Sequence, residues 1–501
     1  MNFANCVDRA ARDDPERTAI VDPNRELTFG ELAAETNAFA KALEELGVEP
    51  NERVALYLPN SVTFVVAYFG AMKYGAIPFP INMRFEGNEI QYVLEDAGAA
   101  VVVTSGEFED TMIDLDVDSL EHSIVANGEH GLAYKKLVQD AGDDYSIYPR
   151  KEDEVAELMY TSGTTGRPKG VKHTHGNLST NARGFLRYMN WGQSETALTV
   201  CPCFHVSGLN ITTTPYVFAG ATNHFLPAWD PETALETMAE REVTYTFLIP
   251  TMVIDLLNYD GIEEYDLSAL DVIGVGGAPM PKERIEAVEQ TFDCTLLEGY
   301  GMTETTPLAA INQLGAEIRK AGSIGTVCEE VMDVRIEHPE TNEEVGVNEK
   351  GELLWSGDTV MDGYYNLPEK NEETFVERNG RTWFRSGDIG RKDENDLLFI
   401  EDRIDDMIIT GGENVYPREV EDVLYGLDGV EAAAVVGASD DRLGEQVVAF
   451  VVGETTEEAL DTGCREWLAG YKVPREFRFV EELPKTSTRK IDKVSLRERL
   501  D

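Results

Sequence analysis

Tyr160-Thr161-Ser162-Gly163-Thr164-Thr165-Gly166-Arg167-Pro168-Lys169-Gly170 is the stretch that decides the fold of this chain. The apolar run before it, 155–160, predicts a strand, and 171–175 predicts a second extended segment. Thr161 to Gly170 contains four hydroxyl side chains, three glycines and one lysine. Glycines let backbone N–H groups approach a ligand closely, and hydroxyls and an ammonium add donors, so this composition suits phosphate oxygens. The stretch is not a Walker A loop, because Lys169 is followed by Gly170 and no helix is expected to begin there.

The charge around this stretch is the reverse of the charge of the whole chain. The sequence contains 93 Asp and Glu residues against 43 Lys and Arg, yet Glu195 is the only acidic residue between positions 158 and 229. The same region contains Arg167, Lys169, Lys172, His173 and His175. A local positive field in an acidic protein indicates an anion-binding site. The alternative is a Ser/Thr/Gly-rich surface loop beside a buried segment.

The stretch resembles the phosphate loop of the adenylate-forming superfamily, which includes acyl- and aryl-CoA synthetases, the adenylation domains of peptide synthetases and beetle luciferase. Within it, the chain is most similar to the AMP-forming acyl- and aryl-CoA synthetase branch. The resemblance implies a loop that binds the phosphates of ATP. The residues that it assigns to the nucleotide are Thr161, Ser162, Gly163, Thr164, Thr165, Gly166 and Lys169.

Length and composition indicate a globular protein of two or more domains. The chain has 501 residues, of which 42% are hydrophobic, so it exceeds one usual core and can fill several. Its formal net charge of -50 resembles that of cytosolic proteins from salt-accumulating, halophilic organisms. At 1 M salt the Debye length is about 3 Å, so self-repulsion would be screened. The alternative is a basic partner, although the acids are scattered and form no single tail.

The sequence predicts a cytoplasmic enzyme. Cys6, Cys201, Cys203, Cys294, Cys328 and Cys464 show no CxxC and no metal-ligand spacing with histidine, which indicates reduced thiols. The first thirty residues are charged throughout, without a signal-peptide core. The most apolar long segment, 64–81, is interrupted by Lys73, Gly75 and two prolines, so it predicts a buried helix and strand and not an integral membrane segment.

Alternating periodicity predicts an α/β fold class. Before the phosphate loop, helices over 29–46, 62–74 and 86–96 alternate with strands over 53–58, 76–80 and 99–104. After it, strands over 197–201, 221–226, 244–248 and 272–276 alternate with helices over 208–218, 231–240, 250–257 and 281–292. Such alternation favours mostly parallel sheets covered by helices, and two series predict two sheets packed side by side.

The rest of the chain predicts smaller parts. Short strands with Gly and Asn turns over 323–400 indicate a small β subdomain. After Arg403, helices over 417–427 and 456–468 and strands over 430–436, 446–452 and 476–480 indicate an α+β unit. The predicted architecture is a large N-terminal domain of two αβ-layered sheets plus a small β subdomain, residues 1–402. A small mobile α+β C-terminal domain, 403–501, follows a hinge near Asp405.

Two further motifs suit a nucleotide. In Leu297-Glu298-Gly299-Tyr300-Gly301-Met302-Thr303-Glu304, glycines flank an aromatic ring against which a flat base could lie, and a carboxylate suits Mg²⁺. The superfamily resemblance assigns Tyr300 to adenine, with Glu298, Gly299 and Gly301 around it, Thr303 to the α-phosphate and Glu304 to the metal. It also assigns Asp388, in Ser386-Gly387-Asp388, and Arg403 to the ribose; without it, they are a turn acid and a surface arginine.

The basic segment 484–490 stands out in so acidic a protein. Pro484-Lys485-Thr486-Ser487-Thr488-Arg489-Lys490 contains no acid and no aromatic residue, which disfavours nucleic acid as its partner. It resembles the catalytic-lysine motif of the superfamily and implies that Lys490 is catalytic. Arg489 replaces the usual glycine of that motif, and the sequence leaves the effect of this change on the placement of Lys490 open. The alternative is a solvated start of a basic helix.

The remaining candidates follow from the resemblance. Residues 402–414 resemble the family hinge and the glycine loop that lines the pantetheine tunnel, which assigns Asp405 to the hinge and Gly411 and Gly412 to CoA. Phe204-His205-Val206-Ser207-Gly208 and Gly276-Gly277-Ala278-Pro279 match segments that line the acyl pocket. They assign His205, Gly276, Gly277 and Ala278 to the substrate, His205 as a wall or gate and not as a base. A histidine in an apolar run is otherwise a packed core residue.

We therefore expect an ATP-dependent acyl-CoA synthetase that uses ATP, Mg²⁺ and coenzyme A on a fatty or aromatic monocarboxylate. The carboxylate attacks the α-phosphate, so no nucleophilic Ser or Cys is needed. Alternatives are a ligase that charges a carrier protein, an oxygenase of the luciferase type, and a nucleotide-binding regulator without turnover. No carrier domain follows Asp501, which favours CoA as acceptor. The sequence leaves the oligomeric state open.

Overall fold

The structure is a computed structural model that describes residues 1–113, 115–128, 130–161, 167–277, 280, 282–316, 318–440, 442–485 and 491–500. The chain forms two compact units, one of Met1–Asp333 and Trp355–Phe384, the other of Val334–Leu354 and Arg385–Asp501. Strands β17 (Met332–Glu337), β18 (Gly351–Gly357) and β20 (Arg381–Lys392) each have residues in both units. The boundary expected between residues 402 and 403 stays a prediction.

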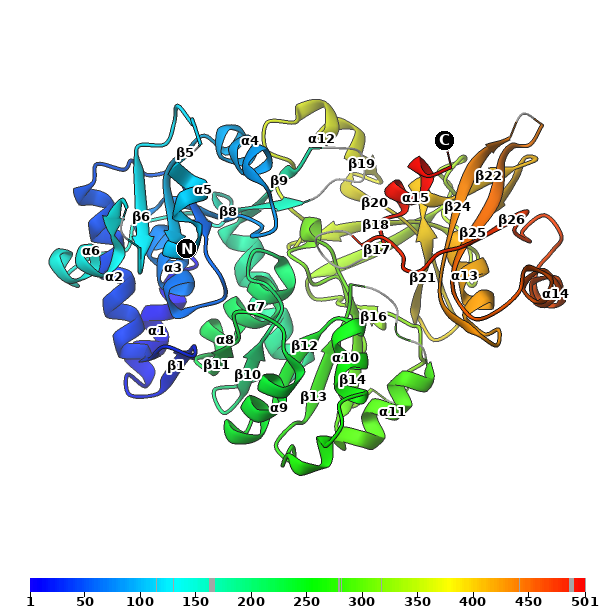
Figure 1. Cartoon of the computed structure of the whole chain (residues 1–501). Coiled ribbons are helices and arrows are strands. Elements are labelled where there is room, and N and C mark those ends of the chain that lie inside the picture. Colours follow the sequence, from blue (N-terminus) through cyan, green and yellow to red (C-terminus); the bar gives the residue numbers. More distant parts are fainter. Residues whose placement is uncertain are drawn as a thin grey trace. The chain divides into compact units, whose positions relative to one another are not determined.

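The first unit contains a five-stranded parallel sheet, coloured blue and cyan in Figure 1. Its strands are, in order, β4 (Ile77–Pro80), β3 (Arg53–Tyr57), β5 (Ala99–Ser105), β6 (His122–Ala126) and β7 (Leu132–Ala133). The helices of this part are α1 (Asn5–Asp13), α2 (Phe29–Glu45), α3 (Val62–Tyr74), α4 (Gly87–Ala97), α5 (Glu109–Ile113) and α6 (Tyr134–Ala141). The alternation expected here is confirmed, with boundaries within one or two residues.

Helix α3 is apolar on all sides because it is buried on all sides. Its start is capped by Ser61, whose side chain accepts a hydrogen bond from the Phe64 N–H, and it ends at Gly75, which has φ +90°. Lys73 is fully buried and donates to Asp8 and to the Asn37 side chain. A buried ammonium needs such partners. The segment that is most apolar in sequence is therefore a 13-residue core helix.

A second sheet has nine strands, most of them green in Figure 1 and the two from the start of the chain blue. The strands are, in order, β16 (Thr326–Val327), β15 (Ala310–Ile311), β14 (Thr295–Tyr300), β13 (Val272–Val275), β12 (Tyr245–Leu248), β10 (Thr196–Thr199), β11 (Thr222–Phe225), β1 (Thr18–Val21) and β2 (Glu26–Thr28). Strands β14 to β1 in this order are parallel, and the outer strands are antiparallel. Helices α8 (Thr214–Ala219), α9 (Pro231–Glu240), α10 (Pro250–Leu257) and α11 (Lys282–Phe292) accompany it. The two α/β series thus form two sheets, as expected, but β1 and β2 join the second sheet from the start of the chain.

The phosphate-loop stretch lies on a separate two-stranded antiparallel hairpin. Strand β8 (Val155–Thr161) pairs with β9 (Lys169–Thr174), with Thr161 opposite Lys169. The second extended segment ends at Thr174 and not at 175, because Thr174 and Asn177 form a capping box that starts α7 (His175–Tyr188). The phosphate loop is therefore the connection of a hairpin whose second strand leads directly into a helix.

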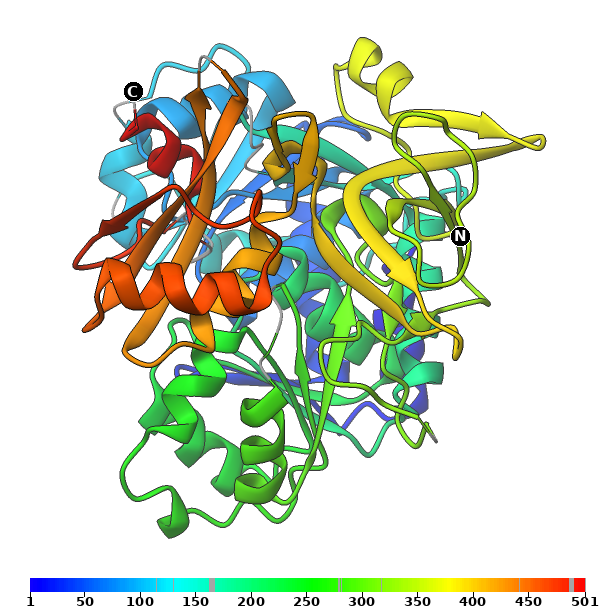
Figure 2. The ribbon, with the colours of Figure 1, turned by 90° about the vertical axis from the view of Figure 1, so that its right-hand side faces the viewer.

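The predicted β subdomain contains a sheet of β17, β18, β20 and β19 (Phe375–Arg378), in this order, with β21 (Leu398–Arg403) paired to β20. Helix α12 (Pro368–Thr374) precedes β19. The hairpin of β19 and β20 is yellow in Figure 2. This confirms a small β region with short connections.

The second unit contains an α+β sheet with a different core on each face. The sheet order is β23 (Glu413–Val415), β22 (Ile408–Thr410), β25 (Gly444–Gly453) and β24 (Val430–Asp440), with β26 (Glu476–Phe479) paired to β25. Val435 and Ala449 pack with α13 (Pro417–Tyr425) and α14 (Glu457–Trp467), whereas Val436 and Phe450 pack with α15 (Lys493–Glu498). Side chains alternate across a strand, so α15 lies on the face opposite α13 and α14.

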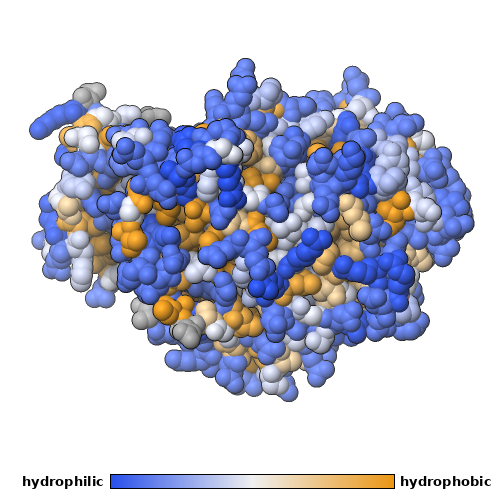
Figure 3. All heavy atoms as spheres, turned by 180° about the vertical axis from the view of Figure 1, so that it is seen from behind, coloured by the Kyte–Doolittle hydropathy of each residue, from blue (hydrophilic) through white to orange (hydrophobic). Residues whose placement is uncertain are grey.

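The surface is strongly polar. The face drawn in Figure 3 is dominated by hydrophilic side chains, and apolar ones form small separate spots. Among the described residues, no helix is both long and apolar enough to cross a bilayer.

Candidate functional site

The candidate residues of the first unit follow the carboxyl ends of neighbouring parallel strands. The segment with His205 follows β10, Gly276 and Gly277 follow β13, and Tyr300 ends β14. Strands β10, β12, β13 and β14 are adjacent and parallel, so these ends lie at one edge of the sheet. In open α/β sheets, ligands bind outside the carboxyl ends of the strands. The sequence motifs therefore converge on the edge where a substrate site is expected.

Thr303 and Glu304 lie in a buried 3-10 turn, η4 (Thr303–Thr305). The turn is closed by the Met302 N–H, which donates to Thr305 Oγ1 at 3.1 Å, and the carbonyl of Glu304 accepts from the Met361 N–H at 2.9 Å. A side chain at Gly301 would clash within the protein, because a Cβ there would lie 1.6 Å from the carbonyl oxygen of Pro307. The turn after β14 is therefore fixed by the backbone before any ligand arrives.

The Tyr300 ring is backed by a second aromatic ring. It stacks on Trp355, with centroids 5.5 Å apart and an angle of 26° between the rings. Trp355 is fully buried. Glu298 accepts a hydrogen bond from the Gly322 N–H at 3.1 Å, and a Cβ at Gly299 would meet Ile311 at 3.6 Å. A rigid ring of this kind can serve as one wall for a flat base.

Tyr364 connects two of the predicted site residues. Its hydroxyl donates to Glu304 Oε1 at 2.8 Å, and its ring lies under Lys169, with Nζ 5.2 Å from the ring centroid. Thr161, opposite Lys169 in the hairpin, donates to the Lys169 carbonyl at 3.5 Å. The arrangement brings the loop lysine and the carboxylate predicted for the metal to one tyrosine. Residues Ser162, Gly163, Thr164, Thr165 and Gly166 lie outside the described residues.

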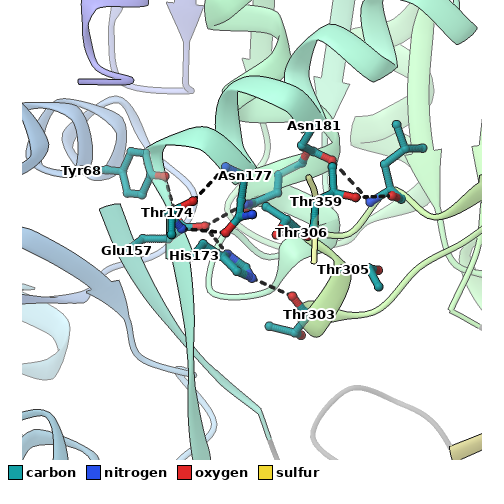
Figure 4. A network of polar contacts seen from close by, with 12 residues as sticks. Tyr68, Glu157, His173, Thr174, Asn177, Asn181, Thr303, Thr305, Thr306 and Thr359 are labelled. Atoms are coloured by element: carbon teal, nitrogen blue, oxygen red, sulfur yellow. Dashed lines mark hydrogen bonds and ion pairs between the residues drawn. The ribbon is translucent and has the colours of Figure 1, made fainter. Parts of the chain in front are cut away.

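A buried polar network connects this hairpin to the Thr303 turn (Figure 4). His173 lies with Nδ1 2.7 Å from Glu157 Oε1 and with Nε2 2.6 Å from the carbonyl oxygen of Thr303. Tyr68 donates to Glu157 Oε2 at 2.7 Å, and burial together with the Glu157 carboxylate raises the pKa of this phenol well above its usual value. The side chains of His173, Glu157 and Tyr68 are fully buried.

The segment that leads to Tyr364 is held by three further hydrogen bonds. Thr306 Oγ1 donates to the Thr359 carbonyl at 2.7 Å, as Figure 4 shows. The Asn177 side chain donates to the carbonyls of Asp358 and Val360. These bonds connect α7, the turn after η4 and residues 358–361. Tyr364 thus comes from a segment with defined backbone partners.

Not every basic residue near the loop adds positive charge. His175 accepts a hydrogen bond from the Phe3 N–H at Nδ1, and burial lowers its pKa to about 3. It is therefore neutral at pH 7. Arg167 lies over the Tyr92 ring, with Cζ 5.1 Å from its centroid. The positive charges near the loop are those of Arg167, Lys169 and Lys172, of which Lys172 is paired with Asp362 at 2.7 Å, and His175 adds none.

His205 is partly buried at the start of the acyl-pocket segment. Its Nδ1 lies 2.9 Å from Ser207 Oγ and accepts from the Ser207 N–H at 3.2 Å, which leaves the proton of a neutral ring on Nε2. Cys201 and Cys203 nearby are buried, and burial raises the pKa of each thiol to about 12. Such thiols are poor nucleophiles at neutral pH.

Gly276 and Gly277 have separate structural reasons to lack a side chain. A Cβ at Gly276 would lie 3.0 Å from the Gly299 carbonyl oxygen and 3.2 Å from the Phe247 ring. Gly277 has φ +82°, a conformation that L side chains rarely adopt. Ala278 lies outside the described residues.

The second unit contains the predicted ribose pair. Asp388 and Arg403 are opposite each other in β20 and β21, and Arg403 Nη1 donates to Asp388 Oδ1 at 2.8 Å. The Asp388 side chain is 7% exposed, and its N–H donates to Ser386 Oγ at 3.0 Å. The pair is preformed, so the carboxylate is already oriented by its arginine.

The predicted hinge is the short turn η5 (Ile404–Asp406). Asp405 is exposed, whereas Asp406 accepts from Arg497 Nη2 of α15 at 2.7 Å. Gly411 and Gly412 connect β22 to β23 with φ +62° and +87°. Positive φ at both positions is the requirement of a type I′ hairpin turn, which glycine meets without strain.

Lys490 and Arg489 lie outside the described residues, but the base of their loop is described. Lys485 and Ile491 form an antiparallel bridge, and the Asp492 N–H donates to the Pro484 carbonyl at 2.8 Å. The Asp492 side chain then caps α15 by accepting from the Ser495 N–H. The loop with Lys490 is therefore closed at its base and followed by a capped helix.

Tyr364, Trp355, His173 and Glu157 were not among the predicted site residues. For Glu157 there was a signal: it is the last acid before the stretch in which Glu195 stands alone, and it interrupts an apolar strand. For Tyr364 and Trp355 no local signal exists, because their partners are at least 55 positions away in sequence.

The chain is similar to known proteins over nearly its whole length. Residues 7–365 match the family model described as AMP-binding enzyme, and residues 419–490 match that of the AMP-binding enzyme C-terminal domain. A feruloyl-CoA synthase of Amycolatopsis sp is 37% identical over 495 residues, which cover 98% of this chain and 97% of that protein. A long-chain-fatty-acid–CoA ligase of Mycobacterium tuberculosis is 32% identical, with coverage of 97% and 95%. Among solved structures, ATP-bound MatB from Rhodopseudomonas palustris is 29% identical with a TM-score of 0.90, and the match covers 100% of this chain and 99% of that one.

Proposed function

The chain belongs to the family of AMP-binding enzymes, and from this premise we propose which residues perform each step of its reaction. It is an ATP-dependent acid–thiol ligase of the acyl-CoA synthetase branch. The reaction converts a carboxylate, ATP and CoA into acyl-CoA, AMP and diphosphate through an acyl-adenylate. The residue roles, the acid and the working environment below are proposals.

The proposed acid is a monocarboxylate with an uncharged aromatic or aliphatic body. The described residues of the segments 204–208, 245–251 and 275–277 include no Lys or Arg that could pair with a second carboxylate. Phe204, Phe247 and Ile249 offer apolar surface instead. A role in fatty acid metabolism and a role with aromatic acids both fit, since the relatives are named for feruloyl-CoA and for long-chain fatty acids.

In the first half-reaction a carboxylate meets the α-phosphate, so like-charge repulsion contributes much of the barrier. We assign Lys169, the phosphate loop 161–166, Thr303 and Lys490 as donors for the phosphates and the departing diphosphate. One preorganised donor contributes about 3 to 4 kcal/mol of transition-state stabilisation. Support comes from the closed hairpin, which holds Lys169 opposite Thr161, and from the fixed turn around Thr303.

Glu304 fits a Mg²⁺ that arrives with the nucleotide. Among the described residues there is no group of three or more His, Cys, Asp or Glu that could hold a metal alone. Mg²⁺ commonly uses one or two carboxylates together with substrate phosphates, and a single buried glutamate oriented by Tyr364 matches that pattern. Bound there, the ion would neutralise charge on the phosphates.

The nucleoside is assigned to two sets of residues. We propose that adenine lies on Tyr300, with Glu298, Gly299 and Gly301 around it, because Trp355 keeps that ring rigid. We propose that Asp388 accepts hydrogen bonds from the ribose hydroxyls, because Arg403 orients its carboxylate. His205, Gly276, Gly277 and Ala278 are assigned to the acid.

In the second half-reaction the CoA thiol must reach the acyl-adenylate after diphosphate leaves. We propose that the domain after residue 402 rotates about Asp405, which withdraws Lys490 and brings the Gly411–Gly412 turn to the pantetheine. The exposed position of Asp405 and the side-chain-free turn support these roles.

The proposed environment is a reducing, salt-rich cytoplasm. All six cysteines are buried and free of disulfides, which suits a reducing compartment. The formal net charge of -50 suits high ionic strength.

The observation that best supports this function is the convergence of Lys169 and Glu304 on Tyr364. The test measures diphosphate release over a panel of carboxylic acids, with and without CoA, in high salt. Release with at least one acid, and thioester only with CoA, is expected. No release with any acid would contradict the proposal, and CoA-independent turnover would indicate another acceptor.

The variant Lys490→Ala separates the two half-reactions. We expect it to abolish diphosphate release from ATP and acid, yet to form thioester from supplied acyl-adenylate and CoA at a rate within about twofold of the wild type, because the lysine acts on phosphate charge. Lys485→Ala at the base of the same loop is the matched control. Equal loss of both half-reactions in Lys490→Ala would make the lysine structural.

A further inference from the structure

Glu157 and His173 form a buried pair to which the proposed reaction assigns no role. They face each other across the hairpin that carries the phosphate loop, Glu157 on β8 and His173 on β9. Both side chains are fully buried. In Figure 4 they point toward each other and toward Thr303. A buried carboxylate is costly unless it is paired and hydrogen-bonded.

The hydrogen-bond geometry fixes the number of protons on the pair. Nε2 of His173 lies 2.6 Å from the Thr303 carbonyl oxygen, which can only accept, so this nitrogen carries a proton. Nδ1 lies 2.7 Å from Glu157 Oε1, and a second proton must lie on that line. The pair is therefore an imidazolium with a carboxylate, or a neutral imidazole with a carboxylic acid. In either form it has no net charge and donates one hydrogen bond to the Thr303 turn.

The pair also contacts two other elements. The Asn210 amide donates to Glu157 Oε1 at 2.7 Å, and the Tyr68 hydroxyl donates to Oε2 at 2.7 Å. Asn210 belongs to the π-helical segment η2 (Ser207–Thr213), which begins two residues after His205. A continuous chain of hydrogen bonds thus runs from Asn210, two residues beyond the segment 204–208 assigned to the acid, through Glu157 and His173, to the turn assigned to the α-phosphate.

We propose that Glu157 and His173 are positioning residues for adenylation, which hold the Thr303 turn in register with the phosphate loop and with the acid-binding segment. The inference rests on the proposed function, because it concerns the step in which these three parts must meet. Neither side chain touches the reacting atoms. A misplacement of about 1 Å at a reacting centre can cost about 100-fold in rate.

The rival explanation is a core ion pair that serves folding alone. The two explanations differ in what happens when the charges are removed together. Removing one partner of a buried pair leaves an unpaired charge and is strongly destabilising, whereas replacing both is often neutral for stability. A positioning pair would lose its effect on the reaction in both cases.

Three variants make this distinction. His173→Leu leaves Glu157 buried without its imidazole partner, so the variant is expected to unfold at a lower temperature. The double variant His173→Leu/Glu157→Gln has no buried charge, and the amide that replaces the carboxylate can still accept from Asn210 and donate to Tyr68. Glu157→Gln alone is the second test. Asn210 orients the new amide with its oxygen toward Nδ1 of His173. The single proton of a neutral imidazole then lies on Nδ1, and Nε2 no longer donates to the Thr303 carbonyl. The matched control is His224→Gln, which removes a buried histidine of β11.

The readouts are the unfolding temperature, the rate of diphosphate release, and the dissociation constant for ATP measured by calorimetric titration. In the double variant and in Glu157→Gln we expect an unfolding temperature near that of the wild type, diphosphate release about 10- to 100-fold slower, and ATP binding about tenfold weaker. His224→Gln is expected to stay within twofold of the wild type on both functional readouts.

Release and ATP binding within twofold of the wild type in the double variant would overturn the inference and leave the pair a folding feature. If the double variant does not fold, Glu157→Gln decides by the same criteria. If the wild type releases no diphosphate with any acid, the proposed function fails. The dissociation constants for ATP of the wild type and the variants then still test the positioning role.

Discussion

At the residue scale, Tyr364 is the side chain on which the nucleotide end of the site depends. It contacts Glu304 through its hydroxyl and Lys169 through its ring. One residue thus orients both a carboxylate and an ammonium group. A hydrogen bond to a charged group contributes about 1.5 to 3 kcal/mol. The phenol therefore fixes the carboxylate more strongly than packing alone would.

Tyr364→Phe separates these two contacts, because it keeps the ring under Lys169 and removes the bond to Glu304. We expect diphosphate release to slow about 10- to 100-fold and the Mg²⁺ concentration for half-maximal rate to rise, with little change in unfolding temperature. Steady-state rates over a Mg²⁺ titration measure this. Tyr188→Phe, which loses only a bond from the Glu330 N–H, is the control. An unchanged Mg²⁺ requirement in Tyr364→Phe would show that the tyrosine does not orient Glu304.

His175 predicts a pH dependence of folding. Burial lowers its pKa to about 3 in the folded protein, against about 6.5 in the unfolded chain. The unfolded chain thus binds a proton that the folded protein does not, so this stabilisation is present above about pH 6.5 and is lost as pH falls toward 3. The maximum slope is about 1.4 kcal/mol per pH unit.

Urea unfolding at pH 7 and pH 5, at constant high salt, tests this sign. Other groups also titrate in this range, so the informative quantity is the difference between wild type and His175→Asn, whose amide oxygen can still accept from the Phe3 N–H. We expect the wild type to lose about 1.5 to 2 kcal/mol more than the variant between the two pH values. An equal loss of unfolding free energy in both proteins would mean that burial does not keep His175 neutral.

At the scale of elements, η5 is the turn to which the proposed two-step reaction assigns its hinge. Asp405 is exposed there, between Asp402, which accepts from the N–H groups of Arg403 and Arg418, and Asp406, which pairs with Arg497. The residues on either side of Asp405 are thus tied to the second unit. The proposed rotation is assigned to the exposed residue between them.

Asp405→Pro fixes φ near -65° at that position and restricts the residue before it. We expect diphosphate release to stay within about threefold of the wild type and thioester formation to fall at least about tenfold, since the rotation is blocked. Single-turnover assays of each half-reaction measure the two rates. Asp405→Ala, which keeps backbone freedom, is expected to be near normal in both. Unchanged overall turnover in Asp405→Pro would exclude a hinge at this residue.

Elements with strong local signals were predictable from the sequence. Helices α3, α9 and α10 begin and end at the expected residues, because Ser61 and Asp230 cap the first two and proline stands at the first position of α9 and α10. The pairing of β1 with β11 was not predictable, since no local pattern reports a partner two hundred residues away. The capping box at Thr174 ends β9 one residue before the end of the predicted extended segment.

For the site, motif resemblance identified only the residues assigned to ligands. It pointed to Glu304 and Lys169, but not to Tyr364, which holds both, nor to the Glu157–His173 pair beside the Thr303 turn. Supporting residues of this kind are determined by tertiary packing, and a single sequence contains no record of it. His175 shows the same limit: its basic side chain is neutral because of burial.

At the scale of the whole molecule, the net charge of -50 predicts a requirement for salt. The Debye length is about 30 Å at 0.01 M and about 3 Å at 1 M, so dilute buffer leaves the acidic surface unscreened. We expect the unfolding temperature and the turnover to rise together with KCl up to roughly 1 M and then to level off, as the Debye length falls to a few ångström. An uncharged osmolyte at equal osmolality is the control. Indifference to KCl, or an equal effect of the osmolyte, would refute the argument from screening.

The position of β1 has a consequence for synthesis. This strand is made first, yet its parallel partner β11 is Thr222–Phe225, so the edge of the nine-stranded sheet can close only after about two hundred further residues have emerged. At 5 to 20 residues per second, that is roughly 10 to 40 s during which the nascent strand has no sheet to join. The earliest part of the polypeptide can thus reach its final place only after the five-stranded sheet has been synthesised, because the strands of that sheet all lie between positions 53 and 133.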